Sequence, residues 1–257
     1  MICNSSETDT LESLLAGLPG LIPAIDIELD DREAITNLQV QNGLQQSFVL
    51  NFERDLLQLC RADAKGRFGR ESVALDTASL RQRDGSQLQR ACLGTMQRGS
   101  TDVSLRVLDL FAGWGMDALS LASGGAEVTS VEWLPVMVAL NRDAARRVPP
   151  ELSSRLRIVH GEALHFLDQL ELSAADVIYL DPMFPERKKG ALPNKRLQWL
   201  AQLSPAGTCA VDKLVELART KAAQRVVLKR RRKDAVYYEP TRKLIGTSVR
   251  YDIYDVG

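Results

Sequence analysis

The fold of this chain is decided by residues 107–118, whose sequence is VLDLFAGWGMDA. An apolar, strand-forming run ends at a turn that holds two glycines, and helix-forming residues follow the turn. Gly113 and Gly115 let the backbone turn sharply and approach a ligand closely, where a Cβ would obstruct it. The first turn of the helix presents unpaired N–H groups to the same place. This stretch therefore predicts a strand, a ligand-binding turn and a helix in succession.

The alternation of strand and helix continues to the end of the chain. Strands are predicted over residues 106–111, 127–132, 156–160, 176–180, 225–228 and 249–254, and helices over 115–122, 135–147, 163–170 and 212–223. Elements of these lengths form right-handed βαβ units, so we predict an α/β fold with a Rossmann-like, mostly parallel sheet and helices on both faces. The pattern before residue 100 is less regular and predicts a small mixed α/β region. The expected domains are residues 1–100 and 101–257.

The composition is that of an ordinary globular protein. The 257 residues include 33 basic and 33 acidic side chains, so contact with nucleic acid has to come from local clusters of charge. The four cysteines and two histidines lack metal-ligand spacing, so neither a disulfide framework nor a metal site is predicted. Acidic residues stand where a signal peptide needs basic ones, and no apolar run approaches the ~20 residues that span a bilayer. We expect a cytoplasmic protein without membrane contact.

Two acids accompany the glycine turn. Asp109 precedes the turn, and Glu132 lies 23 residues further on, at the end of the second predicted strand. An acid at that place suits the ribose hydroxyls of an adenosine-containing cofactor. The glycine spacing alone leaves alternatives open, because Gly113-x-Gly115-x-x-Ala118 also matches the dinucleotide-binding fingerprint. A strand–helix turn without any ligand uses the same residue types.

A second motif, Asp181-Pro182-Met183-Phe184, follows the fourth predicted strand. The Asp181 carboxylate and a backbone carbonyl near Pro182 can accept hydrogens from an amino group on a planar ring, while Phe184 stacks on that ring. Such hydrogen bonds favour a pyramidal nitrogen, whose lone pair can then attack a sulfonium methyl group. Positioning supplies most of the rate, and no metal is required. The simpler alternative is an Asp-Pro turn that ends a strand, with Phe184 in the core.

Basic residues cluster after the fourth and fifth predicted strands, at the edge of the sheet where ligands bind. Runs of charge are usually solvated surface, but several around one predicted site indicate contacts with nucleic-acid phosphates. The residues expected to contact RNA are Arg187, Lys188, Lys189, Lys229, Arg230, Arg231 and Arg232.

On these motifs, residues 105–256 resemble the class I S-adenosylmethionine (SAM)-dependent methyltransferases, and among them the enzymes that modify small-subunit ribosomal RNA. Residues 109–118 and 177–185 carry the resemblance, with support from 226–230 and 250–254. The resemblance implies SAM as donor and N2-methylation of a guanine near the 3′ end of 16S rRNA, with 16S rRNA or the small ribosomal subunit as partner. The cofactor contacts that the resemblance implies are Met116, Asp117, Glu132, Trp133, Glu162, Ala163 and Asp181, and the glycine turn itself adds Asp109, Gly113 and Gly115.

Four of these residues depart from the family pattern. Met116 and Trp133 stand where arginines are usual, and Glu162 and Ala163 stand where a pair of serines is usual. Backbone or apolar contact is therefore the most that we expect from them.

Two alternatives remain open. The same acid–proline–aromatic arrangement can bind other planar amines, such as adenine N6 or a glutamine amide. A non-catalytic RNA-binding or assembly protein on the same scaffold is the other alternative, and the intact Asp181 and glycine turn argue against it.

Overall fold

The computed structural model describes residues 2–3, 8–19, 24–25, 48–61, 71–75, 77, 86–94, 104–182, 195–204 and 210–256. The chain forms two compact units, each assembled from several segments. Unit 1 comprises Met1–Thr77, Leu134–Arg147 and Leu192–Ala206, and unit 2 comprises Ala78–Trp133, Val148–Ala191 and Gly207–Gly257. The predicted domain boundary between residues 100 and 101 remains a prediction.

Unit 2 is built on a sheet that has seven strands in the described part of the chain. Its order is β11-β12-β10-β9-β6-β7-β8. Strands β6 to β10 pair in parallel, whereas β12 pairs antiparallel with β10 and β11 antiparallel with β12. The strands are β6 (Arg106–Asp109), β7 (Glu127–Glu132), β8 (Leu156–His160), β9 (Ala175–Leu180), β10 (Ala222–Arg231), β11 (Arg242–Ile245) and β12 (Val249–Asp255).

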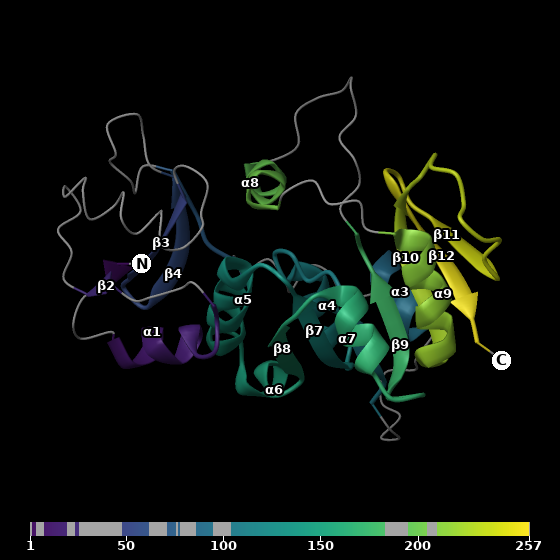
Figure 1. Ribbon diagram of the computed structural model, residues 1–257, viewed down its shortest axis with the longest axis horizontal. Helices are drawn as coiled ribbons and strands as arrows, with labels where there is room; N and C mark the ends of the chain where they lie inside the picture. Colours follow the sequence, from purple (N-terminus) through teal and green to yellow (C-terminus); the bar gives the residue numbers. More distant parts are fainter. Residues whose placement is uncertain are drawn as a thin grey trace. The chain divides into compact units, whose positions relative to one another are not determined.

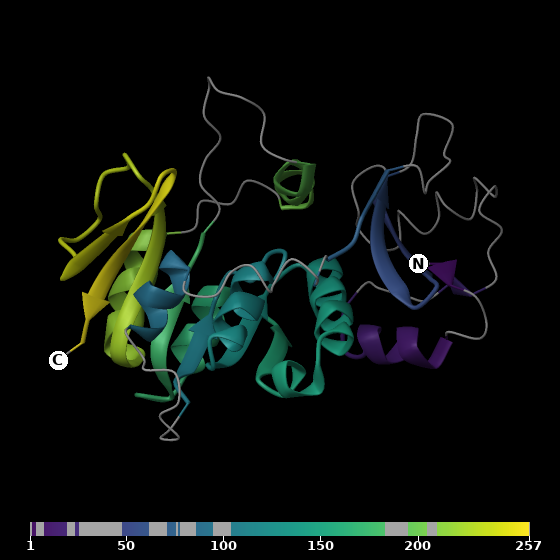
Figure 2. The same ribbon diagram turned by 180° about the vertical axis from the view of Figure 1, so that it is seen from behind.

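Helices cover both faces of this sheet, as predicted. On one face lie α3 (Gln87–Leu93) and α4 (Met116–Ser123), with the short α6 (Pro150–Ser153) beside α4. On the other face lie α7 (Ala163–Gln169) and α9 (Val211–Lys221). Helix α9 is in front of the sheet in Figure 1, and α3 is in front of it in Figure 2. The structure thus confirms the Rossmann-like α/β fold.

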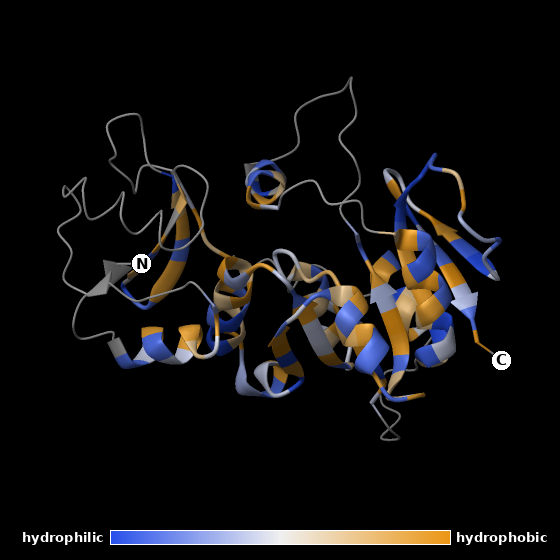
Figure 3. Cartoon of the chain, in the orientation of Figure 1, coloured by the Kyte–Doolittle hydropathy of each residue, from blue (hydrophilic) through white to orange (hydrophobic). Residues whose placement is uncertain are grey.

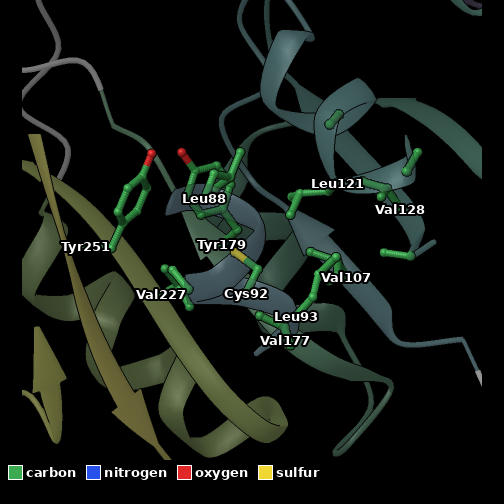
Figure 4. Close-up of a cluster of buried hydrophobic side chains, with 14 of the residues drawn as sticks. Leu88, Cys92, Leu93, Val107, Leu121, Val128, Val177, Tyr179, Val227 and Tyr251 are labelled. Atoms are coloured by element: carbon green, nitrogen blue, oxygen red, sulfur yellow. The ribbon is translucent and has the colours of Figure 1, made fainter. Parts of the chain in front are cut away.

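The pleat of the strands divides the core of unit 2 into two clusters. Val107, Val177 and Val227 face α3 and α4, and Figure 4 shows them packed together with Tyr179 and Tyr251. The residues next to them in sequence, such as Leu108 and Ile178, face α7 and α9 instead. Both faces of each central strand are therefore apolar, as expected for a sheet covered on both sides. Figure 3 shows this as orange colouring along β9.

The predicted elements of unit 2 agree with the observed ones to within a few residues, with three differences. The four-residue helix α6 is absent from the prediction. Strand β10 begins at Ala222, directly after α9, and its register against β9 shifts between Ala222 and Arg225. Strand β11, with the sequence RKLI, is absent from the prediction. It is an edge strand, and charged side chains on an edge hide the apolar alternation by which strands are recognised.

Unit 1 contains a smaller mixed sheet with the order β2-β1-β3-β4-β5. Its strands are β1 (Ile2–Cys3), β2 (Ala24–Ile25), β3 (Phe48–Glu53), β4 (Leu56–Arg61) and β5 (Glu71–Val73). Arg54 and Asp55 join β3 to β4 with φ of 52° and 61°, and two positive φ values in a two-residue loop characterise a type I′ hairpin turn. The mixed α/β character predicted for the N-terminal region is confirmed.

In the described part of unit 1 the helices are α1 (Thr8–Leu15), α5 (Pro135–Arg147) and α8 (Lys195–Leu203). Buried Asp143 organises α5, because its two oxygens accept from Arg146 Nη2 at 2.7 Å and from Arg147 Nε at 2.8 Å. The two arginines then bond Asp55 Oδ1 and the Leu75 carbonyl. This network ties α5 to the strands of its own unit.

No helix among the described residues combines the length and the apolar character needed to cross a membrane.

Candidate functional site

The candidate site lies at the carboxyl ends of β6 and β9, which are adjacent parallel strands. Asp109 at the end of β6 is in register with Tyr179 of β9, and Leu110 N donates to the Tyr179 carbonyl at 3.2 Å. From β6 the chain runs outward to β7 and β8, and only afterwards returns to form β9 and β10 on the other side. Such a reversal of strand order leaves a crevice at the carboxyl ends, where ligands bind in open α/β sheets. The glycine turn and Asp181 therefore share one rim of unit 2.

The glycine turn adopts the backbone that its sequence predicts. Gly113 and Gly115 have φ of 49° and 69°, in the region where a side chain is strained. Gly113 N donates to Glu132 Oε2 at 2.8 Å, and Gly115 N donates to the Ala112 carbonyl at 2.7 Å. Buried Glu132 thus ties the glycine turn to the end of β7.

Asp109 is the most enclosed acid of the site, with only 1% of its surface exposed. Its Oδ1 accepts from Phe111 N at 3.3 Å, while its buried Oδ2 has no hydrogen-bond partner among the described residues. Burial raises the pKa of Asp109 well above its ordinary value, and repulsion from Asp117 adds to the shift. A buried carboxyl oxygen without a hydrogen-bond partner can be satisfied by a bound ligand.

Lys229 of β10 joins two of the acids. Its Nζ donates to Asp117 Oδ2 at 2.8 Å and to Asp181 Oδ2 at 2.7 Å. Asp117 also accepts from the Tyr179 hydroxyl at 2.7 Å, on the same oxygen. We call these four residues (Asp117, Tyr179, Asp181 and Lys229) the Lys229 bridge. It connects the first turn of α4 with the ends of β9 and β10.

The electrostatics of the Lys229 bridge follow from burial and opposed charges. Desolvation raises the pKa of Asp181 to about 6; the Lys229 charge opposes this shift and the Asp117 charge adds to it. Desolvation works against the charge of Lys229, but Asp181 and Asp117 outweigh it and raise its pKa. Burial raises the pKa of Tyr179 well above its ordinary value, so its hydroxyl remains a donor. Figure 4 shows Tyr179 inside the apolar cluster.

The four residues that depart from the family pattern come directly after the glycine turn or after the ends of β7 and β8. Met116 opens α4 and is half-buried, and Trp133, directly after β7, is 43% exposed. Glu162 caps α7, because its side chain accepts from His165 N at 2.8 Å, and Ala163 is buried. Cofactor contact by these four residues remains a prediction.

His160 illustrates the simpler alternative to catalysis. Its Nε2 lies 3.0 Å from the Trp133 carbonyl oxygen, which can only accept, so Nε2 carries the proton. A local hydrogen bond thus satisfies this strand-terminal histidine.

Of the Asp-Pro-x-Phe motif, the structure describes Asp181 and buried Pro182. Phe184 lies outside the described residues, as do Arg187, Lys188 and Lys189. Stacking by Phe184 and RNA contact by the three basic residues remain predictions.

The basic run at residues 229–232 occupies several environments. Lys229 pairs with two acids, as described above. Arg230 is 8% exposed; its guanidinium lies 4.3 Å from the centre of the Tyr237 ring and 3.7 Å from Asp234 Oδ2. Arg231 is half-buried and Arg232 exposed. RNA contact by this run also remains a prediction.

Sequence reasoning missed the Lys229 bridge. One signal was present in the sequence, because Lys229 and Asp181 each directly follow a predicted strand. In the observed register Leu228 pairs with Leu180, so Lys229 and Asp181 come side by side. Strand register cannot be deduced from a run of like charges, which by itself indicates only a solvated face. Asp117 appeared only as a cofactor contact, and Tyr179 only as a residue of a buried strand.

The residues at this rim fit SAM. The two positive-φ glycines form a cradle without side chains, and Glu132 lies where an acid can meet ribose hydroxyls. Asp181, which keeps a quarter of its side chain exposed, supplies an acidic group for a ligand that carries positive charge. Among the described residues, no group of three or more His, Cys, Asp or Glu side chains could hold a metal ion.

Comparison with known proteins gives three findings. A family model described as a SAM-dependent methyltransferase matches residues 33–256. Proteins named ribosomal RNA small subunit methyltransferase J are similar to this chain. The relative from Legionella pneumophila (strain Philadelphia 1) is 39% identical over 69% of this chain and 72% of its own length. The relative from Shewanella amazonensis is 35% identical over 80% of this chain and 86% of its own length.

A crystal structure of a SAM-dependent methyltransferase from Neisseria gonorrhoeae shares the fold. The likeness covers 99% of this chain and 95% of that chain, with a TM-score of 0.68 and 23% sequence identity.

Proposed function

The chain belongs to the family of SAM-dependent methyltransferases, and we propose that it methylates the exocyclic N2 amine of one guanine in small-subunit ribosomal RNA. Its cofactor is SAM, which supplies an electrophilic methyl group when bound. The relatives named ribosomal RNA small subunit methyltransferase J support the RNA substrate. The observation that carries the proposal is the Asp181 carboxylate on the same rim as the glycine turn. A cytoplasmic location is part of the proposal, since ribosomal RNA is found there.

We assign the cofactor site to the rim described above. Gly113, Gly115 and Glu132 form its cradle, and Asp109 lies beneath it. Asp117 acts through the Lys229 bridge, and Asp181 borders the reacting side. Met116, Trp133, Glu162 and Ala163 complete the wall through backbone or apolar contact.

Asp181 activates the amine by accepting its hydrogen. An exocyclic amine is a poor nucleophile because its lone pair is conjugated with the ring. Hydrogen bonds to Asp181 and to the backbone carbonyl at Pro182 favour a pyramidal nitrogen, and Phe184 stacks on the base. A carboxyl group with a pKa of about 6 is ionised near neutral pH and can also take up the proton released by the amine.

The proposed RNA surface continues from the end of β10. Exposed Arg232 and Lys233 and half-buried Arg231 meet phosphates, and exposed Tyr237 offers a ring for stacking. Arg187, Lys188 and Lys189 belong to the same proposed surface.

Methyl transfer from labelled SAM to 16S rRNA and to isolated small subunits tests the proposed function, with nucleosides identified by mass spectrometry. We expect one 2-methylguanosine per RNA. Asp181→Ala removes the acceptor of the amine hydrogen, so turnover should fall by about 100-fold or more, the usual loss for one polar group that acts in a transition state. Circular dichroism and thermal unfolding establish whether this variant is folded.

Asp168→Ala is the matched control, because Asp168 is an exposed acid on α7, away from the rim. It should retain the rate of the parent protein. Methyl-adenosine as product would replace guanine with adenine, and the absence of any methylated nucleoside beside methyl-glutamine in a digest of the subunit proteins would point to a protein amide. Binding of RNA without any binding of SAM would support the non-catalytic alternative. Near-normal turnover in Asp181→Ala would remove Asp181 from the reaction.

A further inference from the structure

The Lys229 bridge is an unusual arrangement of charge for a buried rim. One ammonium group lies between two carboxylates, at 2.8 Å from Asp117 and 2.7 Å from Asp181. A third acid, Asp109, contributes a further negative charge when ionised and raises the pKa of the Tyr179 hydroxyl. The side chains of Lys229 and Asp181 are only 20% and 25% exposed. Water therefore screens these charges weakly, and each depends on its neighbours.

We propose that Lys229 is a positioning residue: it holds the Asp181 carboxylate in place and in its ionised form, while Asp117 and Tyr179 hold Lys229. The inference rests on the proposed function, since it concerns the acid that receives the amine. It adds a residue that touches neither the RNA base nor the methyl group.

The contacts leave Asp181 able to work while Lys229 is bound. Lys229 bonds only Oδ2 of Asp181, and a quarter of the side chain remains exposed. The other oxygen is therefore available for an amine hydrogen. Because the bond to Lys229 holds Oδ2, it restrains the rotation of the carboxylate and limits the directions that the second oxygen can take. Preorganisation of this kind is what positioning in catalysis requires.

Asp117 and Tyr179 explain how Lys229 is itself oriented. The Lys229 stem is flexible, and a lysine with a single acidic partner can rotate away. Asp117 provides a second partner from another element, the first turn of α4. The fully buried Tyr179 hydroxyl donates to the same oxygen of Asp117 and restrains that carboxylate. Three elements thus converge on one ammonium group.

This arrangement argues against Lys229 as a contact to RNA phosphates. Two of its three N–H donors already meet carboxylates at short distances. A phosphate would have to displace an acid that lies partly out of water, which leaves that acid without its cation.

The ionisation of Asp181 reflects every charged group around it. Lys229 favours the ionised carboxylate, whereas desolvation and Asp117 favour the neutral form. The titratable groups that interact with Asp181 or with its immediate partners are Cys92 of α3, Asp109 of β6, Asp117 of α4, Tyr179 of β9, Lys229 of β10 and Tyr251 of β12. Among the described residues of this set Lys229 is the one cation, so its removal should raise the pKa of Asp181.

The first test measures the carboxyl titration of Asp181 in the full chain without RNA. Carbon-13 labelling of aspartate gives the signal, and its loss in Asp181→Asn assigns it. In Lys229→Met the midpoint should rise by about one to three pH units, the usual effect of one close opposite charge on an acid. Lys229→Arg keeps the cation and should restore the parent midpoint.

The second test measures the pH profile of methyl transfer. A carboxyl group that titrates near 6 is about nine-tenths ionised at pH 7, and one that titrates one to three units higher is about one-half to one-hundredth ionised. Lys229→Met should therefore lose about two-fold to ninety-fold in kcat at pH 7 and recover as pH rises. Lys229→Arg should follow the parent profile. A merely structural role would lower the rate equally at every pH.

Lys213→Met is the matched control, since Lys213 is an exposed lysine on α9. It should leave both titration and profile unchanged. An unmoved Asp181 midpoint in folded Lys229→Met overturns the inference, whether or not the RNA is a substrate. If that midpoint moves as expected but the parent protein transfers no methyl group to small-subunit RNA, the proposed function fails and the electrostatic role of Lys229 stands. A uniform loss of rate without a shift of the acid limb also rejects the inference.

Discussion

Asp109 and Asp181 follow neighbouring strands at one rim, yet their carboxylates meet different surroundings. Asp109 is almost fully enclosed, and one of its oxygens has no hydrogen-bond partner among the described residues. Asp181 has Lys229 at 2.7 Å and keeps contact with solvent. Burial favours the neutral form of Asp109, whereas Asp181 titrates at a pKa of about 6. The two aspartates thus differ in their protonation because their surroundings differ.

The sign of the pH effect on Asp181 can be stated directly. Its folded-state pKa of about 6 lies above the ordinary value of 3.8. The folded chain therefore binds this proton more tightly than the unfolded chain, and the associated stabilisation is lost as pH rises from about 4 through about 6. The proposed reaction needs the ionised acid, so we expect activity to change in the opposite sense. Between pH about 4 and about 6 the protein therefore loses the stabilisation linked to the Asp181 proton, while the proposed activity rises.

Gly115 provides a residue-scale prediction. Its φ of 69° lies in the left-handed region, where a side chain costs about 1–2 kcal/mol. Gly115→Ala should therefore lower the free energy of unfolding by about that amount and weaken SAM binding. Urea denaturation with an unchanged m value and calorimetric titration with SAM measure the two effects.

Gly161→Ala is the control for this substitution. A Cβ at Gly161 would make only ordinary contacts, the nearest at 3.6 Å from Val131. Its midpoint in urea should stay closer to that of the parent. Equal losses in the two variants would contradict the strain argument.

Strand β10 shows how one element separates residues that are continuous in sequence. Val227 packs against α3 and α4, and Leu228 packs against α7 and α9. The same alternation sends Lys229 to the acids of the rim and buries Arg230 beside Tyr237. Only towards the end of the strand do basic side chains become accessible, at Arg231 and Arg232. The pleat thus places the residues of one basic run in three environments: beside the acids of the rim, in a buried position and at the surface.

The accessible end of β10 carries the element-scale prediction. Arg231→Gln with Arg232→Gln should weaken binding to small-subunit RNA and reduce the dependence of log K on log salt. Each phosphate contact on single-stranded nucleic acid contributes about 0.7 to that slope, so the loss of two should reduce it by about 1.4. Fluorescence anisotropy over a range of salt concentrations measures both quantities.

The control for this pair removes the same charge elsewhere in unit 2. Arg90→Gln with Arg157→Gln neutralises two exposed arginines, one on α3 and one near the start of β8. It should leave the slope nearly unchanged. Identical slopes for both double variants would mean that β10 ends in an ordinary solvated surface.

At the scale of the whole molecule, every described residue of the candidate site belongs to unit 2. The chain leaves unit 2 after Trp133, forms α5 in unit 1, and returns at Val148. The Asp143 network holds α5 to β4 and to Leu75 within unit 1. The described residues that we propose for methyl transfer therefore all come from one unit.

SAM should stabilise unit 2 selectively, which is the whole-molecule prediction. A ligand at 100 times its Kd raises the free energy of unfolding of the state that binds it by about 2.7 kcal/mol. Hydrogen exchange followed by mass spectrometry should show increased protection in β6, β7, β9 and β10. Strands β3 and β4 of unit 1 serve as the internal reference and should change little. Equal protection in both units would show that they unfold together.

Most strands and helices of unit 2, its parallel sheet and the glycine turn could be predicted from the amino-acid sequence alone, whereas β11 and α6 could not. These features depend on local patterns: apolar runs of strand length, helix formers after glycine, and the fixed hand of βαβ units. Family membership also follows from such local motifs, and the family model confirms it.

Only the tertiary structure decided which charges meet. Lys229 pairs with Asp117, 112 residues away, and with Asp181, 48 residues away, and Arg230 is buried instead of exposed. Strand register and pleat set these contacts, and both arise from pairing between strands distant in the sequence. The sequence of a basic run is the same whether its members bind phosphate, pack against an aromatic ring or hold an acid in place. Their distances and burial in the folded chain distinguish these roles.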